Sequence, residues 1–227
     1  MKISIIMPVY NEEKTILEIV QKVLAVKLDK ELIIVDDGST DSTRHLLKQL
    51  EHEPGVTIIL KNKNEGKGAT LQEGFRHVKG DIVIIQDADL EYDPSDYKKL
   101  IEPIEQNIAD VVFGSRFLGY PRKVLFFWHT LGNKFLTLCS NILHNINLTD
   151  METCYKVFRA SILKELKFVS RRFGFEPEFT AKVARKRYRI YEVPVSYHGR
   201  GYNEGKKITW KDGLAAFYWI VYFRFKP

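Results

Sequence analysis

The 227-residue sequence lacks several features that mark common functional classes. It has only two cysteines, Cys139 and Cys154, which form neither a CxxC pair nor a zinc-ligand spacing, so free buried thiols and a reducing compartment are expected. No apolar run reaches the roughly 18 residues of a membrane-spanning helix, and no signal-peptide pattern follows Met1-Lys2. Any contact with a membrane is therefore expected to be peripheral.

Familiar catalytic and nucleotide-binding motifs are missing as well. No GxGxxG follows the first apolar run, which disfavours a Rossmann dehydrogenase. Gly66-Lys67-Gly68 lacks the Ser/Thr and the upstream glycine of a P-loop. There is no HExxH, no GxSxG and no Cys/His nucleophile signature, and the six histidines show no metal-ligand spacing.

The composition that is present is that of an ordinary globular domain. Hydrophobic residues make up 44% and charged residues 28% of the chain, enough to bury a core. The 35 Lys and Arg residues exceed the 29 Asp and Glu residues, which gives a formal net charge of +6. This excess favours an anionic partner, which could be nucleic acid, a phosphorylated small molecule or an acidic membrane surface.

Short apolar runs alternate with helical patterns through the first half of the chain. The expected strands are Ile3–Val9, Leu32–Val35, Val56–Leu60, Ile82–Ile85 and Val111–Phe113, and the expected helices are Glu12–Val26, a segment carrying Leu46, Leu47 and Leu50, Lys67–Val78, and Pro94–Gln106. This alternation predicts an α/β fold with a mostly parallel sheet flanked by helices. Ligands of such sheets bind beyond the carboxyl ends of the strands, and polar clusters follow Val9, Val35 and Ile85.

The second half has helical and interfacial character. Residues 122–146 are expected to form a partly amphipathic helix, with Arg122 and Lys123 at anionic head groups and Phe126-Phe127-Trp128 entering a membrane interface. Packing of this helix on the sheet or on a second subunit is the alternative. A strand is expected at Tyr191–Tyr197 and a further helix from about Thr209. No linker or repeat is present, so one domain, 1–227, is expected.

Asp87 and Asp89 are the strongest candidates for a metal site. In an extended segment, residues i and i+2 point the same way, so both carboxylates can face one spot at the edge of the sheet. Two such oxygens suit Mg²⁺ or Mn²⁺, which in turn would bridge a diphosphate, and Glu91 could add a third oxygen. The alternative is a solvated acidic turn that caps the helix near Pro94.

Two other polar clusters could serve a nucleotide. A carboxylate of Asp36 or Asp37 could accept hydrogen bonds from a base or ribose, while Ser39, or Thr40 or Asp41 beside it, caps the next helix. Tyr10 could stack on a base, or it could be a core residue.

Taken in order, these segments resemble a known family. They are Pro8–Glu12, Asp36–Asp41, Asn64–Gly68, Gln86–Glu91, Gly114–Arg116, Asp150–Lys156 and Arg200–Lys207. Together they are similar to family 2 glycosyltransferases, specifically the dolichol-phosphate mannosyltransferase-like and polyprenyl-phosphate hexosyltransferase branch. Each motif is weak singly, but the ordered set covers residues 3 to about 210.

The resemblance implies a GT-A fold and an inverting, single-displacement transfer. It divides the chain into a nucleotide-sugar-binding half, 1–115, and an acceptor and membrane-interface half, 116–227. The implied donor-site residues are Pro8, Tyr10, Glu12, Asp36, Asp37, Lys67, Asp87 and Asp89, the implied metal ligands are Asp87, Asp89 and Glu91, and the implied catalytic residues are Asp89, Arg116, Arg200 and Lys206. The third metal position is usually Gln in the mannosyl branch, whereas Glu91 stands here.

The implied reaction transfers a hexose, with mannose favoured and glucose possible, from GDP-mannose or UDP-glucose to dolichyl or polyprenyl phosphate. The enzyme would act peripherally on the cytoplasmic face of a membrane, without nucleic acid as a partner. A phosphate monoester has its second pKa near ~6, so the acceptor is already a nucleophile at neutral pH and no general base is needed. Arg200 to Lys207, with two glycines and three cations, is expected to be a loop that closes over the phosphates.

Two alternatives stay open. A family 2 enzyme acting on a soluble or polysaccharide acceptor would keep the donor site and need no lipid surface. A nucleic-acid-binding module is motivated by the charge and by Arg185–Arg189, although that run is more typical of a solvated helix end leading into a strand.

Overall fold

The computed structural model describes residues 1–119, 126–172, 174–199 and 210–226. In these ranges the strands are β1 (Ile3–Val9), β2 (Lys30–Asp36), β3 (Val56–Leu60), β4 (Ile82–Ile85), β5 (Val111–Ser115), β6 (Lys156–Arg159) and β7 (Ile190–Pro194). The helices are α1 (Ile16–Ala25), α2 (Thr43–Lys48), α3 (Lys67–Phe75), the 3₁₀ turn η1 (Pro94–Asp96), α4 (Tyr97–Glu105), α5 (Phe127–His144), α6 (Ile162–Glu165), α7 (Phe175–Arg185) and α8 (Trp210–Phe225).

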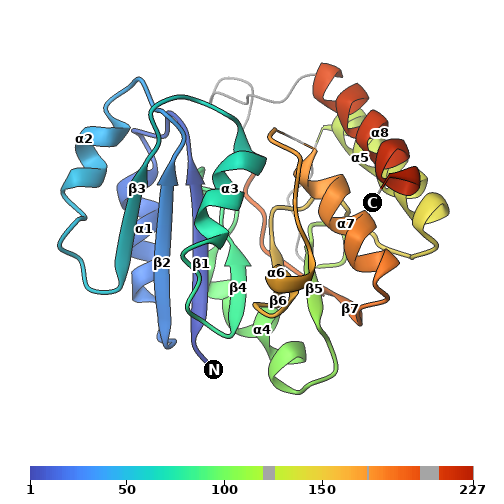
Figure 1. Cartoon of the computed structure of the whole chain (residues 1–227), viewed down its shortest axis with the longest axis horizontal. Helices are drawn as coiled ribbons and strands as arrows, with labels where there is room; N and C mark the ends of the chain where they lie inside the picture. Colours follow the sequence, from blue (N-terminus) through green and yellow to red (C-terminus); the bar gives the residue numbers. More distant parts are fainter. Residues whose placement is uncertain (120–125, 173, 200–209, 227) are drawn as a thin grey trace.

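The described strands form one sheet in the order β3-β2-β1-β4-β6-β5-β7 (Figure 1). β1 pairs in parallel with both β2 and β4, β2 with β3, and β5 with β7, which confirms the mostly parallel sheet. β6 is the exception, because it runs antiparallel to both β4 and β5. No strand was expected there from the sequence, because the segment has four residues, two of them Lys156 and Arg159, and so lacks an apolar run.

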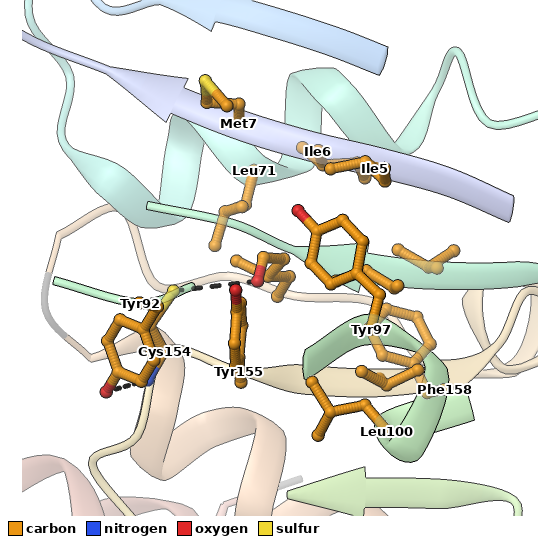
Figure 2. Packing of buried hydrophobic residues seen from close by; sticks show 14 of the residues in the cluster. Ile5, Ile6, Met7, Leu71, Tyr92, Tyr97, Leu100, Cys154, Tyr155 and Phe158 are labelled. Atoms are coloured by element: carbon orange, nitrogen blue, oxygen red, sulfur yellow. Dashed lines mark hydrogen bonds between the residues drawn. The ribbon is translucent and has the colours of Figure 1, made fainter. Parts of the chain in front are cut away.

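The strands β1 and β4 are apolar because helices cover both faces of the sheet. Ile5, Ile6 and Met7 of β1 are fully buried, as expected for a central parallel strand. Figure 2 shows these three residues near Leu71 of α3, and Tyr97 and Leu100 of α4 beside Tyr155 and Phe158.

Two buried tyrosines fix the segment that leaves β4. The hydroxyls of Tyr97 and Tyr155 both donate to Oε1 of Gln86, at 2.7 and 2.8 Å. Gln86 is the first residue after β4 and directly precedes Asp87. The core therefore anchors the backbone from which the Asp87-Ala88-Asp89 motif projects.

Three helices from the second half of the chain, α5, α7 and α8, pack as a group beside the sheet. α5 and α8 lie side by side, and α7 packs against both of them (Figure 1). The predicted helix over 122–146 is α5 within the described ranges, while Arg122 and Lys123 lie outside them. The helix expected from about Thr209 is α8, which begins at Trp210. None of the helices in the described ranges has the length and apolar character to cross a membrane.

The basic run Arg185–Arg189 is a helix end that leads into a strand, as its sequence pattern indicated. α7 ends at Arg185, Arg187 has a positive φ of 55°, and β7 begins at Ile190. Arg185 donates to the carbonyl of Phe223 at 3.0 Å, and Arg189 forms an ion pair with Asp110 at 2.7 Å. These two cations are thus committed to contacts within the fold.

Candidate active site

Three polar segments meet at one edge of the sheet. β2, β1 and β4 are neighbours and run parallel, so the residues that follow Val9, Asp36 and Ile85 emerge on the same side. Hydrogen bonds tie the first two segments together: Ser39 Oγ accepts from the amide of Asn11 at 3.0 Å, and Asn11 Oδ1 accepts from the amide of Thr40 at 2.8 Å. The expected convergence of these clusters is present.

Of the predicted nucleotide contacts, Tyr10 and Glu12 lie in the loop after β1, and Pro8 is the penultimate residue of β1. Tyr10 is 37% exposed, so its ring is not a core residue but lies at the surface. The amide of Glu12 donates to Thr43 Oγ1 at 2.9 Å, which joins this loop to the start of α2.

Asp36 is completely buried at the end of β2. Its Oδ2 accepts from Arg44 Nε at 2.7 Å and from the amides of Gly38 and Ser39 at 3.2 Å each. The carboxylate thus holds the turn that follows the strand. Its contacts are therefore those of a residue that positions this loop.

Asp37 organises the loop that leads into α3. Its carboxylate accepts from Lys61 Nζ at 2.6 Å, from the amide of Glu65 at 3.0 Å and from the amide of Gly66 at 2.7 Å. Asp37 is 3% exposed, so these contacts are made in the interior. The residue predicted to bind the nucleotide therefore also fixes the backbone beside Lys67.

Two glycines allow the start of α3 to lie against the 170–172 segment. Gly66 has φ 96°, and a Cβ there would meet the carbonyl oxygen of Arg171 at 2.6 Å. A Cβ on Gly68 would come closer still to the carbonyl oxygen of Ser170. Both obstacles are backbone atoms, so only glycine fits at these two positions. Lys67 lies between the two glycines in the sequence, so the close approach of the two segments fixes the backbone from which its side chain projects.

Lys67 links the metal motif to a helix on the other side of the site. Its Nζ lies 2.9 Å from Oδ1 and 3.1 Å from Oδ2 of Asp87, and 3.0 Å from Oε1 of Glu176 at the start of α7. Burial disfavours the charged ammonium, but the two carboxylates outweigh burial and raise the pKa of Lys67 well above its ordinary value. One cation therefore balances two acids.

Asp89 and Glu91 are held in different ways. Asp89 Oδ1 accepts from the amide of Glu91 at 3.1 Å, while Glu91 Oε2 accepts from the hydroxyl of Tyr197 at 2.7 Å. Within the described ranges, no group of three or more His, Cys, Asp and Glu side chains is placed to hold a metal ion. A preformed cage that includes Glu91 with both aspartates is thus not formed there.

The remaining donor set still fits a hard divalent cation. Mg²⁺ is commonly held by one or two carboxylates together with substrate phosphates and waters, and not by a cage made only of protein groups. Asp87 and Asp89 provide two carboxylates on one short segment, and Asp87 is already placed beside a cation, the Lys67 ammonium. The chemistry of this pair suits a metal that arrives with a diphosphate.

Arg116, predicted to contact the acceptor phosphate, is bound to a buried acid. Its Nε and Nη2 donate to Oδ2 and Oδ1 of Asp150, each at 2.7 Å, and Asp150 is fully buried. The guanidinium also lies 5.2 Å from the centre of the Tyr197 ring. Arg116 is thereby oriented with little freedom. Arg200 and Lys206 lie outside the described residues.

The structure adds buried ionisable residues that sequence reasoning did not select. Glu152 lies in the segment before β6, Glu176 in the first turn of α7, and Lys156 at the start of β6. Burial and the charge of Glu176 raise the pKa of Glu152 to about 7, and burial lowers the pKa of Lys156. Only the motif Asp150–Lys156 pointed to this region, and it did not single out Glu152.

A row of apolar side chains is exposed along α5. This α5 stripe consists of Trp128, Leu131, Phe135, Leu138 and Ile142, which are between 47 and 76% exposed. They follow a spacing of three and four residues and so share one helix face. Phe135 stacks on Phe217 of α8 with ring centres 6.2 Å apart, so α8 continues the surface.

The chain matches the family model "Glycosyl transferase family 2" over residues 4–167, and it belongs to this family. The match covers the strands β1 to β6 and all the motifs at their ends up to Lys156. The resemblance drawn from the motifs is thereby confirmed.

Two curated relatives use polyprenyl phosphates by name. The chain is 30% identical over 210 residues to the undecaprenyl-phosphate 4-deoxy-4-formamido-L-arabinose transferase of Edwardsiella ictaluri, covering 90% of this chain and 62% of the relative. It is 30% identical over 216 residues to the dodecaprenyl-phosphate galacturonate synthase of Rhizobium johnstonii, covering 91% and 62%. The chain thus spans less than two thirds of the length of these relatives.

Solved structures share the fold. Glucosyl-3-phosphoglycerate synthase from Mycobacterium tuberculosis, in complex with Mn²⁺, UDP and phosphoglyceric acid, aligns with a TM-score of 0.77 at 19% identity, over 100% of this chain and 79% of that one. At this identity the likeness concerns the architecture, and it confirms the predicted GT-A type of α/β fold.

Proposed function

We propose that the protein transfers a hexose from a nucleotide diphosphate sugar to a polyprenyl or dolichyl phosphate. The observation that carries this proposal is the placement of Asp87 and Asp89 directly after β4, beside the ends of β1 and β2. Family membership and the two polyprenyl-phosphate relatives support the same reaction class. Mannose is the favoured sugar and glucose the second, with GDP-mannose or UDP-glucose as the donor.

Asp89 and Asp87 would hold Mg²⁺ or Mn²⁺, and the metal would neutralise the negative charge that develops on the leaving diphosphate. Glu91 is the proposed third ligand, and its Oε2 accepts a hydrogen bond from the hydroxyl of Tyr197. The mycobacterial synthase of the same fold was solved with Mn²⁺ and UDP bound, which supports metal dependence. Tyr10, Glu12, Asp37 and Lys67 would complete the donor site, with Asp36 supporting the loop.

The acceptor phosphate needs orientation more than activation. At neutral pH a phosphate monoester is largely in its dianionic form and can attack the sugar carbon directly. The chain's task is then to align the reactants and to exclude water. Arg116, oriented by Asp150, is proposed to face that phosphate, and Arg200 and Lys206 are proposed to close over it.

A lipid-linked acceptor also requires a surface, and the α5 stripe provides a candidate. Side chains such as Trp128 and Phe135 are exposed on one helix face and could enter the interface of a bilayer. We place this contact on the cytoplasmic face of a membrane. This exposed face favours a lipid acceptor over a soluble or polysaccharide acceptor, which is the second candidate.

The metal site is tested by Asp89→Asn. The variant should keep the melting temperature of the wild type but transfer sugar at least ~100-fold more slowly, a loss of ~2.7 kcal/mol in transition-state stabilisation. A panel of nucleotide sugars with Mn²⁺, followed by thermal shift, identifies the donor for this assay. Near-normal turnover of the variant, or a wild type unaffected by EDTA, would contradict the proposal.

The membrane surface is tested by replacing Phe126, Phe127 and Trp128 with Ser. We expect this triple variant to lose co-flotation with liposomes that contain anionic lipid, while its affinity for the nucleotide sugar is unchanged. The matched control replaces Leu60 and Ile108 with Ser in the same way; these side chains lie elsewhere on the molecule and are 40 and 41% exposed. Flotation of the triple variant equal to that of the control would favour a soluble acceptor.

A further inference from the structure

Two carboxylates near the Asp87-Ala88-Asp89 motif each have an oxygen that accepts no hydrogen bond from the described residues. Among the described residues, Glu176 Oε2 and Glu152 Oε1 are buried and have no hydrogen-bond partner. Glu176 is only 6% exposed, whereas Glu152 is partly exposed although this oxygen is not. A buried polar atom without a partner carries a desolvation cost of about 1–3 kcal/mol. Buried polar atoms in folded proteins nearly always form a hydrogen bond, so a ligand or a water molecule is expected to donate to these oxygens.

These oxygens lie next to the place where the donor's diphosphate is proposed to bind. The other oxygen of Glu176, Oε1, is 3.0 Å from Lys67 Nζ, which is itself 2.9 Å from Asp87. Glu152 lies close enough to Glu176 for that charge to be the largest neighbouring influence on it. In a nucleotide sugar the hexose is bonded directly to the second phosphate. A group beside Lys67 is therefore within reach of the sugar ring.

The surrounding groups do not offer a substitute partner. Lys156 is fully buried, and its ammonium donates to the carbonyl oxygens of Met151 and Thr153. Lys67 already contacts both oxygens of Asp87 and one of Glu176. The two unsatisfied carboxylate oxygens therefore accept from something that the described part of the chain does not supply.

We propose that Glu152 and Glu176 form the sugar subsite of the donor, where their oxygens accept hydrogen bonds from the hydroxyl groups of a neutral hexose. This inference rests on the proposed function and specifies its substrate class. Sugar hydroxyls are hydrogen-bond donors that match carboxylate acceptors. A uronic acid would instead place a third negative charge beside two acids, so the subsite excludes uronate donors.

The test measures the contribution of the sugar to binding affinity separately from that of the nucleotide. Calorimetry with Mn²⁺ compares UDP, UDP-glucose and UDP-glucuronate, or GDP, GDP-mannose and the matching uronate where GDP is the nucleotide that binds. Wild type should prefer the neutral nucleotide sugar over the nucleoside diphosphate. It should also prefer it over the uronate by at least ~10-fold. Glu152→Gln should reduce both preferences by about tenfold and leave affinity for the nucleoside diphosphate within about twofold.

Controls distinguish a lost contact from a damaged fold. Glu165→Gln removes an acid that is 52% exposed and paired with Lys186 on the surface, and it should change none of these affinities. Melting curves check that Glu152→Gln folds. If neither UDP nor GDP binds the wild type, the donor site and with it the subsite are overturned. If the diphosphate binds but Glu152→Gln affects sugar and diphosphate equally, or the uronate binds as well as the hexose, only the sugar subsite is overturned.

Discussion

Replacement of Lys67 by Met removes one ammonium group and keeps a side chain of similar length. In the wild type this ammonium is paired with Asp87 and Glu176, and the exposed fractions of the three side chains are 17, 23 and 8%. The variant therefore leaves two mostly buried carboxylates close together without their shared cation. Their mutual repulsion and their desolvation are then uncompensated.

Removal of one partner from a buried ion pair typically costs about 3–5 kcal/mol. Asp87 is nearly a quarter exposed, so water screens part of the effect and the lower end, ~3 kcal/mol, applies to Lys67→Met. For a chain of this size, 1 kcal/mol corresponds to roughly 2–4 °C in melting temperature. We expect the melting temperature of Lys67→Met to fall by about 6–12 °C.

Thermal melts with and without Mn²⁺ measure this effect. In the proposed metal site Lys67 would compete with the metal for Asp87, so we expect Mn²⁺ to stabilise Lys67→Met more than it stabilises the wild type. The matched control is Lys22→Met, which breaks a pair with Glu18 whose side chains are 48 and 57% exposed. Exposed pairs contribute only about 0–1 kcal/mol. A decrease no larger than that of the control would refute the reasoning that Lys67 balances the two acids.

Two further predictions concern packing and pH. Gly68→Ala should lower stability by about 1–3 kcal/mol, because its Cβ meets the carbonyl oxygen of Ser170. In the control, Gly132→Ala in α5, the Cβ meets no atom within 4 Å, so stability should be equal or higher. Equal melting temperatures of the two variants would contradict this prediction. Burial and two nearby arginines lower the pKa of His144 from 6.5 to about 4, so its contribution to stability is present above 6.5 and is lost as pH falls towards 4. Urea titrations should show that His144→Leu flattens this pH dependence, and an unchanged profile would exclude His144 as its source.

The sequence predicted the fold well where strands are apolar throughout. β1, β3 and β4 have the predicted bounds because their residues are nearly all hydrophobic and flanked by polar turns. β6 was missed because it has only four residues and two of them, Lys156 and Arg159, are charged, although Lys156 is fully buried. Hydrophobic periodicity gives no sign that a lysine is buried, even though carbonyl groups of the preceding loop, those of Met151 and Thr153, accept from its ammonium.

Some contacts around the candidate site could be expected from the sequence, and others could not. The expectation of a mostly parallel sheet was enough to place Asp36, Asp37 and Asp87 at the carboxyl ends of its strands. The pairing of Lys67 with Glu176 joins residues 109 positions apart, and no spacing rule relates them. Glu152 was passed over for the same reason, since its environment is created by α7 and β6.

The predicted aspartates fall into two groups according to their hydrogen-bond and ion-pair partners. Asp36 and Asp37 are buried and accept hydrogen bonds from the loops on either side, so they shape the walls of the site. Asp87 is held by a cation that a metal would have to share or displace. Without a ligand, Lys67 is the cation that Asp87 and Glu176 share. In the proposed donor site, a metal and a diphosphate would together add charges of both signs beside Asp87 and Lys67, so that both groups would keep a partner of opposite charge when the donor binds.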